Sequence, residues 1–116
     1  MPSLSVRLNN PGLIRDGAFA RNCQGYAGPG EKGFARFDDW GLGLGALARL
    51  LRMPSYQGLT IREIISRYAP DSENDTEAYI RHVCQRTGLK PEDKITNPII
   101  LADVMAAITA HEGWRP

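Results

Sequence analysis

A chain of 116 residues is long enough for one hydrophobic core and too short for two, so we expect a single domain over residues 1–116. Its hydrophobic fraction of 42% and charged fraction of 23% are typical of a globular protein. The formal net charge of +1 comes without a Lys/Arg-rich block, so the composition gives no electrostatic basis for binding nucleic acid.

No apolar run has the length of a membrane span, and residues 1–7 lack the basic and apolar regions of a signal peptide. We therefore expect synthesis in the cytoplasm, with any role outside it depending on another delivery route. The two cysteines, Cys23 and Cys84, are too few and too far apart for a metal site, and we expect no cofactor. They form either one disulfide or two buried thiols.

Residues 1–37 are rich in Gly, Asn and Pro, with turn dipeptides at Asn10-Pro11, Asp16-Gly17 and Pro29-Gly30. A long irregular segment is usually disordered or functional, and the aromatic residues of this one argue against disorder. We expect an irregular lobe with short strands around residues 18–20 and 34–37.

The first helix is expected to begin at Asp38 or Asp39, either of which can cap it, and to run to about Met53. Glycines at 41, 43 and 45 weaken its first turns, which suggests that another backbone packs closely there. Helical spacing assigns four large apolar residues to its inner face: Trp40, Leu44, Leu47 and Leu51.

A second helix is predicted from its cap, Thr60, to Pro70, with Ile61, Ile64, Ile65 and Tyr68 on one face. A polar loop over residues 71–76 leads into a third helix. Asn74 and Glu77 have the spacing of a capping box, and Gly88 ends that helix. Its inner face is read as Ile80, Val83, Cys84 and Thr87.

The fourth helix has Asn97 as its cap and Pro98 at its first position, and is expected to run to Glu112, before Gly113. Its apolar stripe is Leu101, Val104, Met105 and Ile108. The sequence thus predicts a mainly α domain of about four helices facing a small irregular or β-hairpin N-terminal lobe, with a cleft between them.

Glu112 continues the apolar stripe of the fourth helix, four residues after Ile108. Burial at this position and the partial negative charge of a helix C-terminus both disfavour a carboxylate, so both raise its pKa. A carboxyl group kept protonated in this way can serve as a general acid. The alternative is a surface Glu near a frayed terminus.

Cleavage of a glycosidic bond uses two carboxyl groups on opposite sides of a cleft. Glu31 is one candidate for the second group, and the loop before the third helix offers Asp71, Glu73 and Asp75. Each also has a simpler explanation, because Glu31 lies in a Gly-rich turn and Asp75 can cap a helix. A different reading pairs Cys23 or Cys84 with His82 or His111 as a nucleophile and base.

Four further segments occur in a defined order: residues 9–15 (Asn-Asn-Pro-Gly-Leu-Ile-Arg), residues 33–38 (Gly-Phe-Ala-Arg-Phe-Asp), a helix end at residues 48–51 (Ala-Arg-Leu-Leu) and residues 68–70 (Tyr-Ala-Pro). This order resembles flagellar-type N-acetylglucosaminidases, in which an Asn-Asn element is followed by a Phe-rich strand, a helix ending in Leu-Leu and a Tyr-Ala turn. In that family a Glu-Ser-Gly-Trp segment with the catalytic acid comes before the Asn-Asn element. Here residues 111–114 (His-Glu-Gly-Trp) lie at the other end of the chain, which suggests a circularly permuted lysozyme-like domain.

The resemblance implies a peptidoglycan glycosidase: a muramidase, a glucosaminidase or a lytic transglycosylase. It assigns Glu112 as the catalytic acid but does not place the family's second acidic position. Glu31 stays a candidate second catalytic group on the residue chemistry above, and we expect Asn9, Asn10, Tyr68, Trp114 and Glu73 to bind the glycan. The Ser of the Glu-Ser-Gly segment is absent here.

Residues 9–12 (Asn-Asn-Pro-Gly) and 72–76 (Ser-Glu-Asn-Asp-Thr) also resemble small phage and prophage virion-associated proteins. This implies delivery to the cell wall or periplasm by a virion or a secretion apparatus. The alternative function is a noncatalytic component of such an assembly that retains a lysozyme-like fold.

Overall fold

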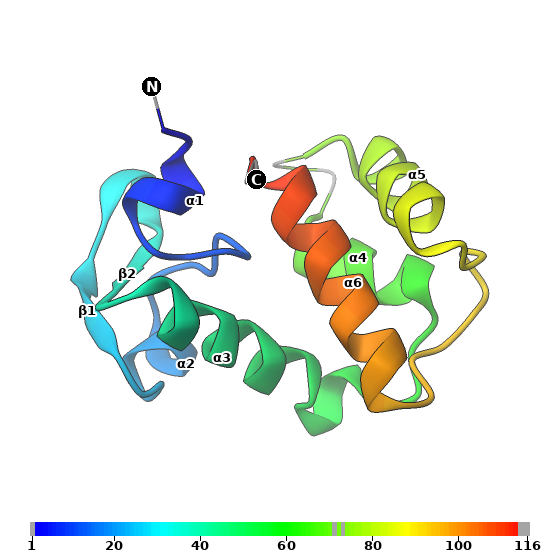
Figure 1. The fold of residues 1–116 in the computed structure, drawn as a ribbon, viewed down its shortest axis with the longest axis horizontal. Helices are drawn as coiled ribbons and strands as arrows, with labels where there is room; N and C mark the ends of the chain where they lie inside the picture. The colour runs from blue at the N-terminus through cyan, green and yellow to red at the C-terminus, as the bar shows by residue number, and fades with distance from the viewer. Residues whose placement is uncertain (1, 71, 73, 114–116) are drawn as a thin grey trace.

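The computed structural model describes residues 2–70, 72 and 74–113 (Figure 1). The helices of this part are α1 (Leu4–Arg7), α2 (Ala18–Arg21), α3 (Trp40–Leu51), α4 (Ile61–Tyr68), α5 (Thr76–Thr87) and α6 (Pro98–His111), and the strands are β1 (Tyr26–Pro29) and β2 (Ala35–Phe37). Short 3-10 turns span Glu31–Gly33 and Pro54–Tyr56. Figure 1 shows two lobes, with α1, α2 and the strands on one side, α4, α5 and α6 on the other, and α3 running between them.

The predicted mainly helical domain with a small hairpin lobe is confirmed. The four long helices correspond to α3, α4, α5 and α6, and the short helices α1 and α2 were not predicted. The prediction of a strand at residues 18–20 was wrong, because these residues belong to α2. The expected strand at 34–37 is close to β2, which pairs antiparallel with β1 from Tyr26↔Phe37 to Pro29↔Ala35. One edge of β2 is occupied by β1, and on its other edge the N–H groups of Ala35 and Phe37 bond to the carbonyls of Ile14 and Leu8. The α2 segment closes its own backbone hydrogen bonds instead.

Helix α3 begins after Asp39, whose carboxylate accepts a hydrogen bond of 2.8 Å from the backbone N–H of Leu42. Its fully buried face consists of Gly43, Ala46, Leu47 and Leu51, so the prediction was wrong for Trp40 and Leu44, which are half-buried. The reason lies at Gly43: a Cβ there would overlap the carbonyl oxygen of Asn9 and lie 2.6 Å from Pro11 Cδ. The backbone of residues 9–11 packs directly on this turn, as the glycines suggested.

The ends of the other long helices follow local side-chain chemistry. Thr60 and Glu63 form a capping box at α4, Gly88 ends α5 with a φ of 77°, and Asn97 caps α6 ahead of Pro98. The predicted capping box of Asn74 and Glu77 was wrong. Asp75 caps α5 instead, because its carboxylate accepts from the backbone N–H of Ala78 at 3.1 Å.

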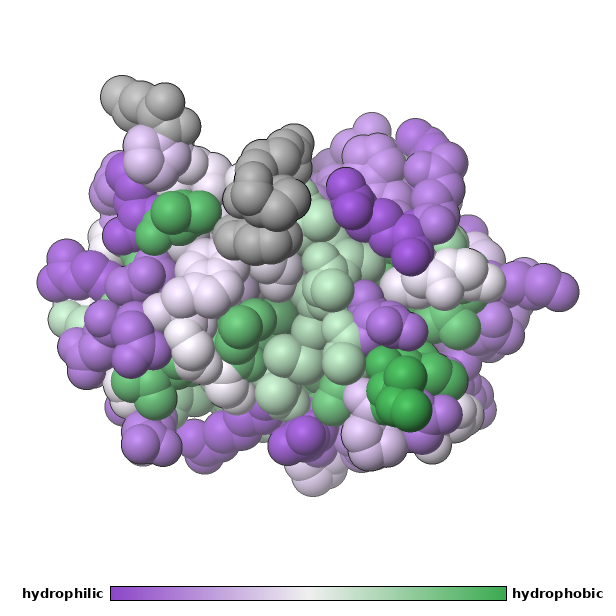
Figure 2. Space-filling view, in the orientation of Figure 1, coloured by the Kyte–Doolittle hydropathy of each residue, from purple (hydrophilic) through white to green (hydrophobic). Residues whose placement is uncertain are grey.

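The core of the helical lobe lies where α5 and α6 pack against α4 and α3, and its most buried side chains include Tyr79, Ile80, Val83, Val104 and Ile108. Hydrophilic side chains cover the outer sides of both lobes in Figure 2, while apolar ones follow the middle of this face, where α6 crosses it. None of the described helices combines the length and the apolar character needed to cross a membrane.

Helix α1 joins the two lobes at the end of α6. The hydroxyl of Ser5, which is fully buried, donates a hydrogen bond of 3.1 Å to the backbone carbonyl of Glu112. Ser3 lies against Gly113, where a Cβ would be 2.9 Å from the Ser3 Cβ. Residues 3–5 and 112–113 are therefore neighbours, and this contact fixes the backbone that carries Glu112.

Candidate functional site

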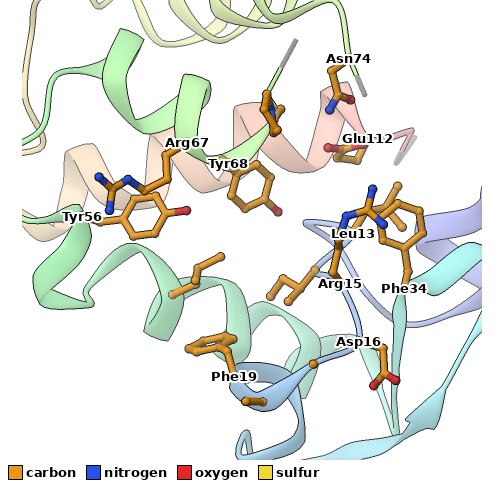
Figure 3. A pocket seen from close by; sticks show the side chains of 16 residues that line it. Leu13, Arg15, Asp16, Phe19, Phe34, Tyr56, Arg67, Tyr68, Asn74 and Glu112 are labelled. Atoms are coloured by element: carbon orange, nitrogen blue, oxygen red, sulfur yellow. The ribbon is translucent and has the colours of Figure 1, made fainter. Parts of the chain in front are cut away.

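A cleft of about 560 Å³ lies between the two lobes. Its lining consists of residues 13–19, Phe34, Leu50, Tyr56, residues 67–70, Asn74 and Glu112. Figure 3 shows Tyr68 near the middle of this lining, between Tyr56 and Glu112, with Leu13 and Arg15 on the facing wall. The structure thus brings together Glu112, Tyr68 and part of the residue 9–15 loop, three elements that the sequence placed at a cleft.

Glu112 is the residue at the C-terminal cap of α6, and its half-buried side chain lines the cleft. Burial raises the pKa of Glu112 to about 6. The hydroxyl of Tyr79 donates a hydrogen bond of 2.8 Å to Oε2 of Glu112, which acts in the opposite direction and lowers the pKa. The carboxyl group is therefore protonated in a substantial fraction of molecules at mildly acidic pH.

Tyr68, the last residue of α4, connects the helical lobe to the loop lobe. Its hydroxyl donates a hydrogen bond to the backbone carbonyl of Gly12. Its pKa is held well above the usual value, first by burial and then by the nearby charge of Glu112. Tyr68 also packs edge-to-face on Tyr79, with ring centroids 6.5 Å apart. It is a neutral hydrogen-bonding group in the cleft and a structural tie across it.

Asn9 and Asn10 shape the loop behind the cleft and do not line it. Asn10 is completely buried; its side-chain amide donates to the carbonyls of Ile14 and Ala35 and accepts from the N–H of Ile14, each at 2.9 Å. Asn9 donates to the carbonyl of Phe37 at 3.3 Å. These bonds hold the segment that presents Leu13 and Arg15 to the cleft.

Glu31 lies away from the cleft, in the exposed turn between β1 and β2. Both of its carboxylate oxygens accept hydrogen bonds from Arg7 at 3.2 Å, which lowers the pKa of Glu31. Asp75 is used as the cap of α5. Asp71, Glu73 and Trp114 lie outside the described residues.

Asp16 lines the cleft and was not among the predicted site residues. Its two oxygens are occupied by Arg21 at 3.0 Å and by the hydroxyl of Tyr26 at 2.5 Å, and the bond from Arg21 is the main cause of its lowered pKa. Among the described residues of the lining, Glu112 and Asp16 are the two acidic ones. Glu112 is the one whose environment favours a proton.

Two arginines of the lining were also missed by the sequence analysis. The guanidinium of Arg15 lies over the ring of Phe34 at 5.1 Å, and that of Arg67 over the ring of Tyr56 at 5.8 Å. Tyr79 was missed as well, although it lies four residues before the buried Val83 and so on the same helical face. Arg67 lies on an exposed position of α4, so the local sequence contained no signal for its place in the cleft.

The alternative reading as a Cys/His enzyme gains no geometric support. Both cysteines are free thiols, so the disulfide alternative is excluded, and Cys23 is buried beside the carbonyl of Phe19. Burial raises the pKa of Cys84. The histidines instead contact each other, with Nδ1 of His82 and Nδ1 of His111 2.8 Å apart. Among the described residues, no group of three or more His, Cys, Asp and Glu side chains has the geometry to hold a metal ion.

Comparison with known proteins gives one informative similarity, and no protein-family model matches the chain. The chain is 40% identical to Protein P5 of Pseudoalteromonas phage PM2 over 76 residues, which is 64% of this chain and 48% of P5. The match therefore spans about half the length of P5. The predicted relationship to phage proteins is supported by this similarity, and the name of P5 states no activity.

Proposed function

We propose that this protein cleaves the glycan strands of peptidoglycan, as a lysozyme-like glycosidase with Glu112 as its general acid. The observation that carries the proposal is a half-buried carboxyl group, with its pKa raised to about 6 by burial, at a cleft between a helical lobe and a hairpin lobe. A carboxyl group with this pKa retains a proton to donate at mildly acidic pH.

In the proposed reaction, the carboxylic acid of Glu112 donates its proton to the glycosidic oxygen as the bond to the anomeric carbon breaks. The leaving sugar departs with a new hydroxyl group, and positive charge develops on the remaining sugar. Glu112, now a carboxylate, can take a proton from the group that attacks the anomeric carbon. The acid is restored by this second transfer.

The attacking group is proposed to be the 6-hydroxyl of the same sugar. This route needs one carboxyl group and gives a 1,6-anhydro product without consuming water. This route fits the described lining. There Asp16 is already bound by Arg21 and Tyr26, and Glu31 is not part of the lining. We therefore favour a lytic transglycosylase over a hydrolase with two carboxyl groups.

Tyr79 is proposed as a positioning residue, because its hydroxyl fixes Oε2 of Glu112. Tyr68 is proposed to contact the glycan, since its ring lines the cleft between Glu112 and Tyr56 (Figure 3). Delivery within a virion is proposed from the similarity to a phage protein.

Purified protein incubated with cell-wall sacculi tests the proposal. Wild type should release 1,6-anhydro muropeptides, identified by mass spectrometry, and Glu112→Gln should reduce the rate at least about 100-fold. Glu31→Gln is the matched control, because it removes an equivalent charge outside the cleft, and it should retain the rate. Products with ordinary reducing ends would show that the enzyme is a hydrolase and not a lytic transglycosylase. Absence of release by wild type, with binding to sacculi retained, would support a noncatalytic virion component instead.

A further inference from the structure

One end of the cleft carries an exposed guanidinium group that lies over an aromatic ring. Arg67, in the last turn of α4, lines the cleft, and its Cζ lies 5.8 Å from the centroid of the Tyr56 ring. Figure 3 shows this pair on the opposite side of Tyr68 from Glu112, with the hydroxyl of Tyr56 directed into the cleft. Tyr56 itself is only 8% exposed, so the ring is a rigid support for the arginine.

The charge of Arg67 is not neutralised by a protein carboxylate. In the part of the chain that the structure describes, the ion pairs join Arg7 to Glu31, Arg21 to Asp16 and Arg62 to Glu77, and none involves Arg67. The result is a cationic group that faces the cleft with its donors available to a ligand.

Two acidic residues that could pair with Arg67, Glu63 on the same helix and Asp16 in the cleft lining, have other partners. Glu63 lies one helical turn before Arg67, and its Oε1 accepts the backbone N–H of Thr60 at 2.9 Å. That capping bond is the main reason for the lowered pKa of Glu63, with Arg67 a minor contributor. Asp16, across the cleft, is bound by Arg21 and Tyr26.

A guanidinium group that rests on an aromatic ring keeps its N–H edge free, and this edge matches the two oxygens of a carboxylate. Neutral sugar hydroxyls and N-acetyl groups have no such pair of charged oxygens. Peptidoglycan offers carboxylates on its stem peptides, and on the lactyl groups of those muramic acid residues from which the stem peptide has been removed. Chitin, a polymer of N-acetylglucosamine, has none.

We propose that Arg67 and Tyr56 form a subsite for a carboxylate of the substrate, so that the cleft selects acidic peptidoglycan strands over neutral N-acetylglucosamine polymers. This inference rests on the proposed function, because it takes the ligand of the cleft to be a glycan. Arg67 binds the carboxylate, and the ring of Tyr56 supports the guanidinium.

The test measures binding by calorimetry in the Glu112→Gln chain, which prevents turnover. Three ligands are compared: chitotetraose, glycan strands freed of stem peptides by an amidase, and strands that keep their stem peptides. Adding Arg67→Gln should weaken binding of the acidic strands about tenfold and leave chitotetraose unchanged. Adding Arg62→Gln instead, a matched change on the same helix outside the cleft, should leave the binding of all three ligands unchanged.

The three ligands also identify the source of the carboxylate. A loss confined to peptide-free strands assigns the lactyl carboxylate, and a loss confined to peptide-bearing strands assigns the stem peptide. Equal effects of Arg67→Gln on chitotetraose and on both acidic ligands, or no effect on any, would overturn the subsite while leaving the glycosidase proposal intact. Failure of the parent chain to bind all three, together with wild type that releases nothing from sacculi, would overturn both.

Discussion

The hydroxyl of Tyr79 donates a hydrogen bond of 2.8 Å to Oε2 of Glu112, and the ring of the same tyrosine stacks on His111 with centroids 3.7 Å apart. Tyr79 belongs to α5, and the other two residues lie at the end of α6. The position of the Glu112 carboxyl group is therefore set by the packing of two helices. Burial and the hydrogen bond act on its pKa in opposite directions, and burial is the larger effect.

Tyr79→Phe should raise the pKa of Glu112 further, because it removes the hydrogen bond that lowers it and keeps the buried ring. A general acid is active while protonated, so the upper pH limit of activity should move to higher pH in the variant. The pH dependence of kcat/KM on solubilised glycan strands measures this. A limit that stays in place or moves to lower pH would show that Tyr79 does not act through Glu112.

The raised pKa of Glu112 also predicts how stability depends on pH. A carboxyl group with a pKa of about 6 in the folded chain and 4.5 in the unfolded chain binds more protons when folded between these values. The contribution of Glu112 to the free energy of unfolding should therefore fall by about 2 kcal/mol as pH rises from below 4.5 to above 6.

Glu112→Gln lacks this titration, so the difference in unfolding free energy between wild type and this variant isolates it. As pH rises, wild type should lose stability relative to Glu112→Gln. The free energies of unfolding from urea titrations at pH 4 and pH 7 measure this change. The pKa of His111 is lowered by burial and by His82, so its titration contributes in the opposite sense. Because Glu112 is not a cause of that shift, the contribution is present in both proteins and largely cancels in the difference. A difference that is constant with pH would mean that Glu112 is not buried in solution.

The sequence predicted the ends of the long helices well because those ends depend on residues close in the chain. Asn97 and Pro98 start α6, Thr60 and Glu63 start α4, and Gly88 ends α5. Each of these signals acts through a backbone group within a few residues, so no tertiary information was needed.

Features that depend on distant contacts were predicted less well. Residues 18–20, expected as a strand, are helical, and the strand that pairs with β2 is β1. The local sequence does not indicate which segment pairs with β2. The fully buried face of α3 centres on Gly43 because residues 9–11 pack there, which leaves Trp40 half-buried. Glu112 was found because helical periodicity marks it, whereas Arg67 lies on an exposed helical position that the tertiary fold turns into cleft lining.

Asn10→Ala should destabilise the protein by about 2–4 kcal/mol, because it removes three buried hydrogen bonds and leaves backbone groups of Ile14 and Ala35 without that partner. Urea unfolding measures the loss. Asn22→Ala is the matched control, since Asn22 is exposed and makes one side-chain bond to Ala18, and it should cost less than about 1 kcal/mol. Similar losses in the two variants would contradict the structural role of Asn10.

Two glycines of α3 should respond in opposite ways to the same substitution. Gly43→Ala places a Cβ against the carbonyl of Asn9 and 2.6 Å from Pro11 Cδ, so α3 and the residue 9–11 loop have to separate. Overpacking of this kind costs about 1–3 kcal/mol, which exceeds the gain in helix propensity.

Gly45→Ala is the matched change two residues later, where a Cβ meets nothing within 4 Å. It should stabilise the protein by about 0.5–1 kcal/mol, because alanine favours the helix and restricts the unfolded chain. The midpoints and slopes of urea unfolding for the two variants and wild type decide the matter. Because residues 13–15 continue from the displaced loop into the cleft, Gly43→Ala should also weaken glycan binding, and Gly45→Ala should not. Stabilisation by both substitutions would contradict the close packing of the loop on α3.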